Sequence, residues 1–141
     1  MEIAINYWAV LGAAVASFVL GALWYGPVFG KPWMRLMGFT PESMKAMTMT
    51  PTKAMIGIFI GSLLTSYVLA HAIVFGIAYT GIAGALGGMM AGFYYWLGFA
   101  LPLTATAYLV EGKSAKLWFL NAAYYLVSFL IAGAILGAWP A

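Results

Sequence analysis

The side chains that could take part in chemistry are few, and His71 is the first of them. It is the only histidine of the chain, and it lies inside a long uncharged stretch. An ionisable group at such a position is by default a functional candidate. The alternative is a neutral imidazole that is hydrogen-bonded to a tyrosine or a carbonyl. Because no second histidine or carboxylate lies in the uncharged stretches, the sequence predicts no metal site.

Polar and aromatic side chains form a second group of candidates. Four of them follow i, i+3, i+4, i+7 spacing and therefore share one helix face: Asn121, Tyr124, Tyr125 and Ser128. Tyr95 and Trp96 lie in the middle of another uncharged stretch, and we expect Thr104 at a depth similar to that of Asn121. Unpaired hydroxyl and amide groups cost several kcal/mol in hydrocarbon, so these faces should point inward. Two interpretations stay open: interhelical hydrogen bonds, or a small polar-aromatic cavity, centred on Asn121, for an uncharged or amphipathic ligand.

The acidic residues argue against an enzyme. Glu2, Glu42 and Glu111 are the only ones, and all three lie outside the uncharged stretches. No carboxylate can therefore orient His71 as a general base or carry a proton within those stretches. The sequence predicts no enzymatic activity and no cofactor.

Four uncharged stretches must position these side chains. They cover about residues 3–25, 54–77, 82–110 and 117–139 of a chain of 141 residues that is 65% hydrophobic and 6% charged. A soluble domain has about 25% charged residues, so lipid must be the solvent here. At 1.5 Å per residue, each stretch can cross a hydrocarbon core of about 30 Å as a helix. The predicted fold is all-α: residues 1–141 form a single transmembrane domain, a four-helix bundle.

The basic residues predict an orientation. All six lie in two of the gaps between the stretches: Lys31, Arg35, Lys45 and Lys53 in the first, Lys113 and Lys116 in the third. The positive-inside rule then places residues 27–53 in the cytoplasm and both termini outside it. Thr40-Pro41-Glu42 predicts a short interfacial helix in this loop. We expect the four basic residues of the loop to contact anionic lipid headgroups rather than nucleic acid, and the loop could also dock an unidentified protein.

Glycines four residues apart predict close helix contacts. They occur in three of the stretches: Gly57 and Gly61; Gly84, Gly88 and Gly92; Gly133 and Gly137. Such faces serve packing inside the bundle or the interface of a homo-oligomer, and the spacing alone does not separate the two.

Several short motifs resemble the DUF1761 family. They are the run Leu20–Pro27, Phe29-Gly30-Lys31 with Trp33-Met34, Trp96–Phe99, Glu111-Gly112-Lys113, Asn121–Tyr125 and Gly133–Trp139. The resemblance implies a small, mostly bacterial, multi-pass protein of the inner (cytoplasmic) membrane and assigns no activity. We therefore expect a non-enzymatic, homo-oligomeric membrane protein that binds or passes a small uncharged or lipid-like molecule. The alternative is a structural or assembly subunit whose basic loop docks a partner protein or anionic lipid.

Overall fold

The computed structural model describes residues 3–141, so Glu2 lies outside the described residues. Every regular element of the described chain is helical, which confirms the all-α prediction. In chain order the elements are α1 (Tyr7–Leu23), the π-helix η1 (Trp24–Val28), α2 (Gly30–Met37), α3 (Pro41–Lys45), α4 (Pro51–Thr80), α5 (Gly84–Tyr95), the π-helix η2 (Trp96–Ala100), α6 (Leu101–Thr104), α7 (Thr106–Leu109) and α8 (Ala115–Ala138).

Three helices are long and apolar enough to cross a membrane: Tyr7–Val28, Pro51–Thr80 and Ala115–Ala138. The fourth expected stretch does not form one long α-helix, because it is divided into α5, η2, α6 and α7. Pro102 lies just after η2, where it lacks the N–H that a continuous α-helix would use. The described chain therefore has three helices that could span a membrane and one segmented helical region beside them.

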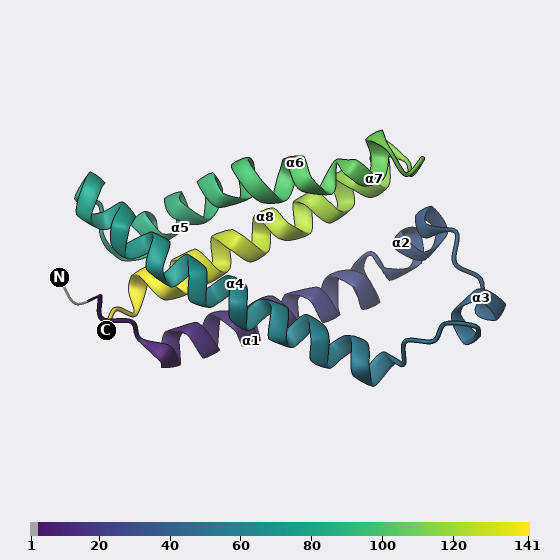
Figure 1. The fold of residues 1–141 in the computed structure, drawn as a ribbon, viewed down its shortest axis with the longest axis horizontal. Helices are drawn as coiled ribbons and strands as arrows, with labels where there is room; N and C mark the ends of the chain where they lie inside the picture. The colour runs from purple at the N-terminus through teal and green to yellow at the C-terminus, as the bar shows by residue number, and fades with distance from the viewer. Residues whose placement is uncertain (1–2) are drawn as a thin grey trace.

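The helices form an elongated arrangement in which α8 is central (Figure 1). It runs beside α5 and then beside η2, α6 and α7, and it also packs against α1 and α4. The described ends of the chain lie together at one end of the molecule. Toward the opposite end, α4 separates from α6 and α7 (Figure 1), and α4 packs mainly on α1.

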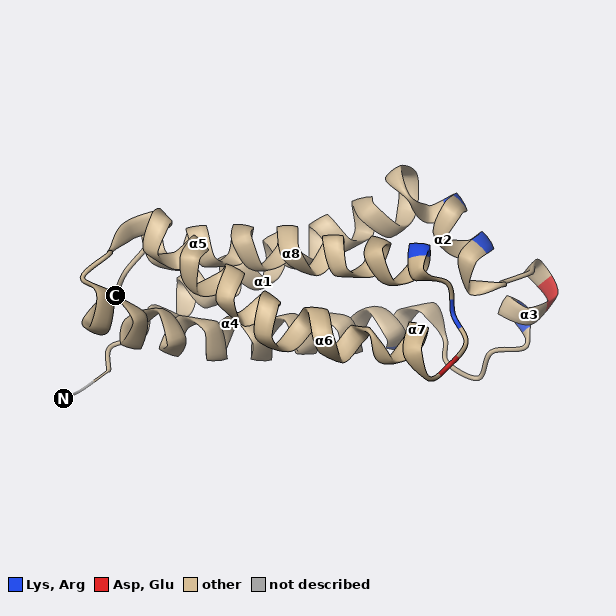
Figure 2. Ribbon diagram, turned by 90° about the horizontal axis from the view of Figure 1, so that it is seen from above, with Lys and Arg blue, Asp and Glu red and all other residues tan. Residues whose placement is uncertain are grey.

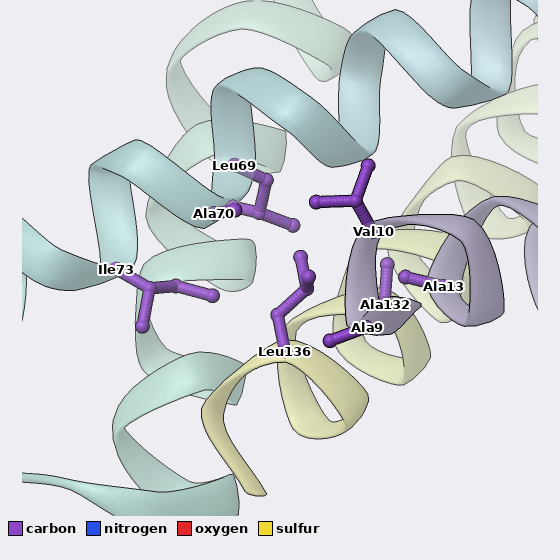
Figure 3. Close-up of a cluster of buried hydrophobic side chains, with 8 residues drawn as sticks. All are labelled: Ala9, Val10, Ala13, Leu69, Ala70, Ile73, Ala132 and Leu136. Carbon is purple, nitrogen blue, oxygen red and sulfur yellow. The ribbon is translucent and has the colours of Figure 1, made fainter. Parts of the chain in front are cut away.

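Small side chains allow the close packing at the centre. A buried cluster joins α1, α4 and α8, and half of its members are alanines (Figure 3): Ala9, Val10, Ala13, Leu69, Ala70, Ile73, Ala132 and Leu136. Only 28–33% of the residues in each long apolar window are buried inside the molecule. Most of the apolar surface of these helices therefore needs cover from outside, which lipid supplies in a membrane.

The contact between α5 and α8 is a contact between backbones. A Cβ atom added to Gly88 would collide with the carbonyl oxygen of Gly133, and one added to Gly92 would collide with that of Phe129. In the reverse direction, a Cβ atom on Gly137 would collide with the carbonyl oxygen of Gly84. Only glycine can occupy these positions without moving one helix, because any side chain would separate the two backbones.

The charged residues that the structure describes gather at one end of the molecule (Figure 2). The basic residues of α2, α3 and the start of α8 lie at the end opposite the C-terminus. This separation agrees with the pattern on which the predicted orientation rests, and the orientation itself stays a prediction.

Candidate functional site

Two tyrosines connect α8 to the first helical region. The Tyr25 hydroxyl donates a hydrogen bond of 2.8 Å to Oδ1 of Asn121. The Tyr124 hydroxyl donates one of 3.1 Å to the backbone carbonyl of Ser17. Both bonds join segments about a hundred residues apart in the sequence. Asn121 and Tyr124 therefore lie inward, as the helical spacing predicts. We call Ser17, Trp24, Tyr25, Asn121 and Tyr124 together the Asn121 cluster.

The π-helix η1 brings Tyr25 to this position. Its wider turn is closed by a hydrogen bond of 2.7 Å from the N–H of Phe29 to the carbonyl of Trp24. Pro27 lies within this turn, and π-turns commonly occur where the α-helical ladder is interrupted. The centre of the Tyr25 ring lies 5.2 Å from the centre of the Tyr124 ring. The centre of the Trp24 ring lies 6.2 Å from the centre of the same Tyr124 ring. Aromatic rings at these distances attract one another through their edges and faces.

The second π-helix contacts the same part of α8 from another side. In η2, the N–H of Leu101 bonds to the carbonyl of Trp96. The Trp96 indole then donates a hydrogen bond of 2.8 Å to the carbonyl of Ala122. The Trp118 indole of α8 returns one of 3.2 Å to the carbonyl of Leu101. Both π-helices thus begin with a tryptophan, and both contact α8: η1 at Asn121 and Tyr124, and η2 at Ala122.

The other predicted site residues are spread over the molecule. Thr104 bonds within its own helical region, to the carbonyls of Ala100 and Leu101, and the donor at Asn121 is Tyr25. Ser128 is buried and Tyr125 is exposed. His71 donates from Nδ1 to the Tyr67 carbonyl (2.9 Å) on its own helix, far along the molecule from Asn121.

Tyr95 lies in a different place, an open groove between α4, the α5–η2 region and α8. The groove has a volume of about 450 Å³ and is lined by Leu64, Thr65, Val68, Leu69, Tyr95, Phe99 and Phe129. Its walls are almost wholly apolar, and the side chains of Thr65 and Tyr95 bring the only hydroxyl groups among these residues. The Tyr95 and Phe99 rings lie 5.6 Å apart along one wall. This arrangement suits an apolar molecule with few polar groups.

The predicted packing and headgroup residues also differ among themselves. Gly88, Gly92, Gly133 and Gly137 lie in the α5–α8 contact, whereas Cβ atoms on Gly57 and Gly61 would meet nothing within 4 Å. Lys31, Arg35, Lys45 and Lys53 are all exposed. Within residues 3–141, no three histidine, cysteine or acidic side chains come together as metal ligands would.

Sequence reasoning did not include Ser17, Trp24 and Tyr25 among the candidate residues. A signal for them exists: Ser17, Gly21 and Trp24 follow i, i+4, i+7 spacing and share one face of the first helical region. Gly21 makes room on that face, because a Cβ atom there would lie 3.0 Å from the Tyr124 hydroxyl. The position of Tyr25 depends on the π-turn, which the spacing does not reveal.

Comparison with known proteins gives a family and no function. No curated protein and no solved structure matches the chain. The family model described as a protein of unknown function, DUF1761, matches residues 8–137. This match includes the Asn121 cluster and all of the three long apolar helices except Tyr7 and Ala138, and it agrees with the resemblance carried by the sequence motifs. The chain therefore belongs to the DUF1761 family.

Proposed function

We propose that this chain is a non-enzymatic membrane protein that binds or passes a small uncharged or lipid-like molecule in the groove beside Tyr95. Residues 84–109 form its fourth span, and its charged end lies in the cytoplasm of a bacterial cell. The open helix face at Gly57 and Gly61 is the expected interface of a homo-oligomer.

The groove is the observation that carries this proposal. Its volume of about 450 Å³ falls in the range of about 300–1,000 Å³ that is usual for small-molecule sites. Its apolar walls can pack closely against hydrocarbon, and such van der Waals contacts are one of the forces that hold apolar groups together inside lipid. The hydroxyls of Thr65 and Tyr95 could orient a ligand that carries one or two polar atoms.

The position of the groove favours a ligand that arrives through the membrane. The groove is open on one side, and α4 packs on α5 and α8 but separates from α6 and α7 beyond it (Figure 1). In a membrane such an opening faces lipid rather than water. A lipid-like molecule can therefore enter sideways without crossing the charged end of the protein.

The Asn121 cluster has a different part in this proposal. Its side chains fill the space between η1 and α8 with ring contacts and hydrogen bonds. We therefore give the cluster a stabilising role and place the ligand site at Tyr95 and its neighbours.

Filling the groove tests the proposal. Val68→Trp adds a large ring to the groove wall, whereas Ile60→Trp adds the same ring to an exposed position of α4 outside the groove. Native mass spectrometry of protein extracted in a mild detergent should show a retained molecule in wild type and in Ile60→Trp. Val68→Trp should lower its occupancy at least about tenfold, which corresponds to a loss of about 1.4 kcal/mol of binding free energy.

Two results would count against the proposal. Equal occupancy in both tryptophan variants would show that the retained molecule binds elsewhere. Protein that carries no molecule under conditions that preserve its native thermal stability would remove the ligand-binding function.

A further inference from the structure

The segment 40–53 joins α2 to α4 and contains α3, and it differs from every other part of the charged end. All of its residues are exposed. Three of them are methionines, with exposed fractions of 43% for Met44, 46% for Met47 and 59% for Met49. Its first part is helical as α3, because the Thr40 side chain accepts a hydrogen bond of 3.1 Å from the N–H of Ser43 as an N-cap.

The neighbouring helix α2 shows the contrast. It packs against η1 and α8, and its Trp33 and Met34 are half-buried. The three methionines of the segment 40–53 have no such cover from the described chain, and α3 projects from the end of the molecule (Figure 1). A folded segment that leaves three large apolar side chains exposed needs a further surface to cover them.

The charge of the segment indicates what this surface is. Lys45 lies on α3 and Lys53 in the first turn of α4, both exposed and interleaved with the methionines, and Glu42 is the one acidic residue among residues 27–53. Exposed apolar side chains beside basic ones are typical of segments that lie in a membrane interface. The apolar groups enter the headgroup region there, and the basic groups attract anionic lipid.

The connections of the segment fix its position relative to the membrane. The apolar helix Tyr7–Val28 comes before it, with α2 in between, and the segment leads into α4. The helices Tyr7–Val28 and α4 are both long enough to cross a membrane. Exposed Met55 and Ile56 follow Lys53 directly. The boundary between polar and apolar surroundings therefore falls at the start of α4, at the same end of the molecule as α3 (Figure 2).

We propose that residues 40–53 dock on the anionic surface of the same membrane that the chain crosses. Met44, Met47 and Met49 insert below the headgroups, while Lys45 and Lys53 attract the lipid phosphates. The occupant is the membrane itself, so the docking is independent of the groove and of any ligand bound there.

A fluorophore at residue 48 tests this docking in the full chain. The sequence contains no cysteine, so Thr48→Cys gives a single labelling site and leaves all three methionines in place. The labelled protein is reconstituted into vesicles of phosphatidylcholine alone and of phosphatidylcholine with phosphatidylglycerol, each with quencher-bearing lipids. The matched control is Tyr79→Cys, at a residue that is 93% exposed and distant from the basic residues.

We expect lipid quenching at residue 48 to be stronger in the anionic vesicles. It should weaken in about 1 M salt, where the Debye length falls to about 3 Å. Lys45→Gln and Lys53→Gln should each weaken the docking equilibrium roughly fivefold in the anionic vesicles only. Replacement of the three methionines by serine should remove the quenching in both vesicles. The label at residue 79 should be insensitive to lipid charge.

Two results would overturn the proposal. The first is a label at residue 48 that stays in water in both vesicles, which would mean that another partner, such as a protein, covers the methionines. The second is quenching that depends on neither lipid charge nor the two lysines, because the membrane surface would then not be recognised through its anionic lipids.

Discussion

Among residues 3–141, the hydroxyl of Tyr25 and the amide of Asn121 form the one hydrogen bond between two side chains that joins the first helical region to α8. Its length of 2.8 Å is close to the usual value for an O–H donor. In a membrane such a bond stabilises the fold by only about 0.6–2 kcal/mol, because the separated helices also find partners. The loss of one member has a larger effect when it leaves the other member buried and unpaired.

Removal of this hydroxyl gives a first prediction. Tyr25→Phe leaves Oδ1 of Asn121 without its donor, and we expect the free energy of unfolding to fall by about 1 kcal/mol. Reversible unfolding of the protein in mixed micelles measures this change. Tyr94→Phe is the matched control, because that side chain is 66% exposed.

A double substitution sharpens this first test. If the bond acts as the structure indicates, Tyr25→Phe should have little further effect in an Asn121→Leu background. Additive effects of the two substitutions would mean that the hydroxyl and the amide do not act as a pair.

At the scale of single residues, the sequence predicts some members of the Asn121 cluster. The helical spacing of Asn121, Tyr124 and Ser128 is sufficient to place them on one inward face, since hydrocarbon excludes unpaired polar groups. The identity of the partner is not contained in that spacing. Thr104 can satisfy its hydroxyl on its own helix, as it does through Ala100, so its depth in the bundle does not require a contact with Asn121.

The two π-helices are the elements that shape the interior. Each has a wider turn closed on the carbonyl of a tryptophan, and each lies against the same part of α8. Length and composition predict the apolar stretches that contain the two π-helices, because these properties decide which segments can span a membrane. The spacing of apolar residues does not predict the π-turns, because each is closed within its own segment, on the carbonyl of Trp24 or of Trp96, and it does not show where such a turn lies.

The α5–α8 contact gives a second stability prediction. Gly88→Leu places a side chain where the carbonyl of Gly133 lies, so the two helices must separate. We expect a loss of at least about 3 kcal/mol, more than ordinary overpacking of a core, or failure to fold. Thermal unfolding in detergent, followed by size-exclusion chromatography, reports both outcomes.

Gly57→Leu is the control for this prediction. A Cβ atom at residue 57 would meet nothing within 4 Å, so the stability of the single chain should stay near that of wild type. A change in subunit number in this control alone would support the proposed oligomer interface. Wild-type stability of Gly88→Leu would contradict the contact itself.

At the scale of the whole molecule, the described charged residues lie at one end and the described ends of the chain lie at the other (Figure 2). The sequence predicts this separation well. Four basic residues lie in residues 27–53 and two lie after α7, and each of these segments follows a helical region that runs away from the described ends of the chain. Four spans cannot be read from length alone, because α5, η2, α6 and α7 divide the third stretch.

The predicted topology can be measured with reporters. A fusion after Ala141 should be active with a reporter that works only outside the cytoplasm, because the positive-inside rule keeps the basic end within it. The same reporter placed at Gly112, between α7 and α8, should be inactive. Activity of a cytoplasm-dependent reporter after Ala141 would show an odd number of spans or the opposite orientation.

The contact of α5 with α8 has a consequence for biogenesis. The glycines of α5 are synthesised well before their counterparts Gly133 and Gly137, because α8 follows α5 in the chain. At about 5–20 residues per second, the segment 84–109 waits a few seconds for its partner. During that time its interrupted backbone must be shielded by α4 or by the insertion machinery. The packing of residues 84–109 is therefore finished only after α8 has been synthesised, and not when the first helices are inserted.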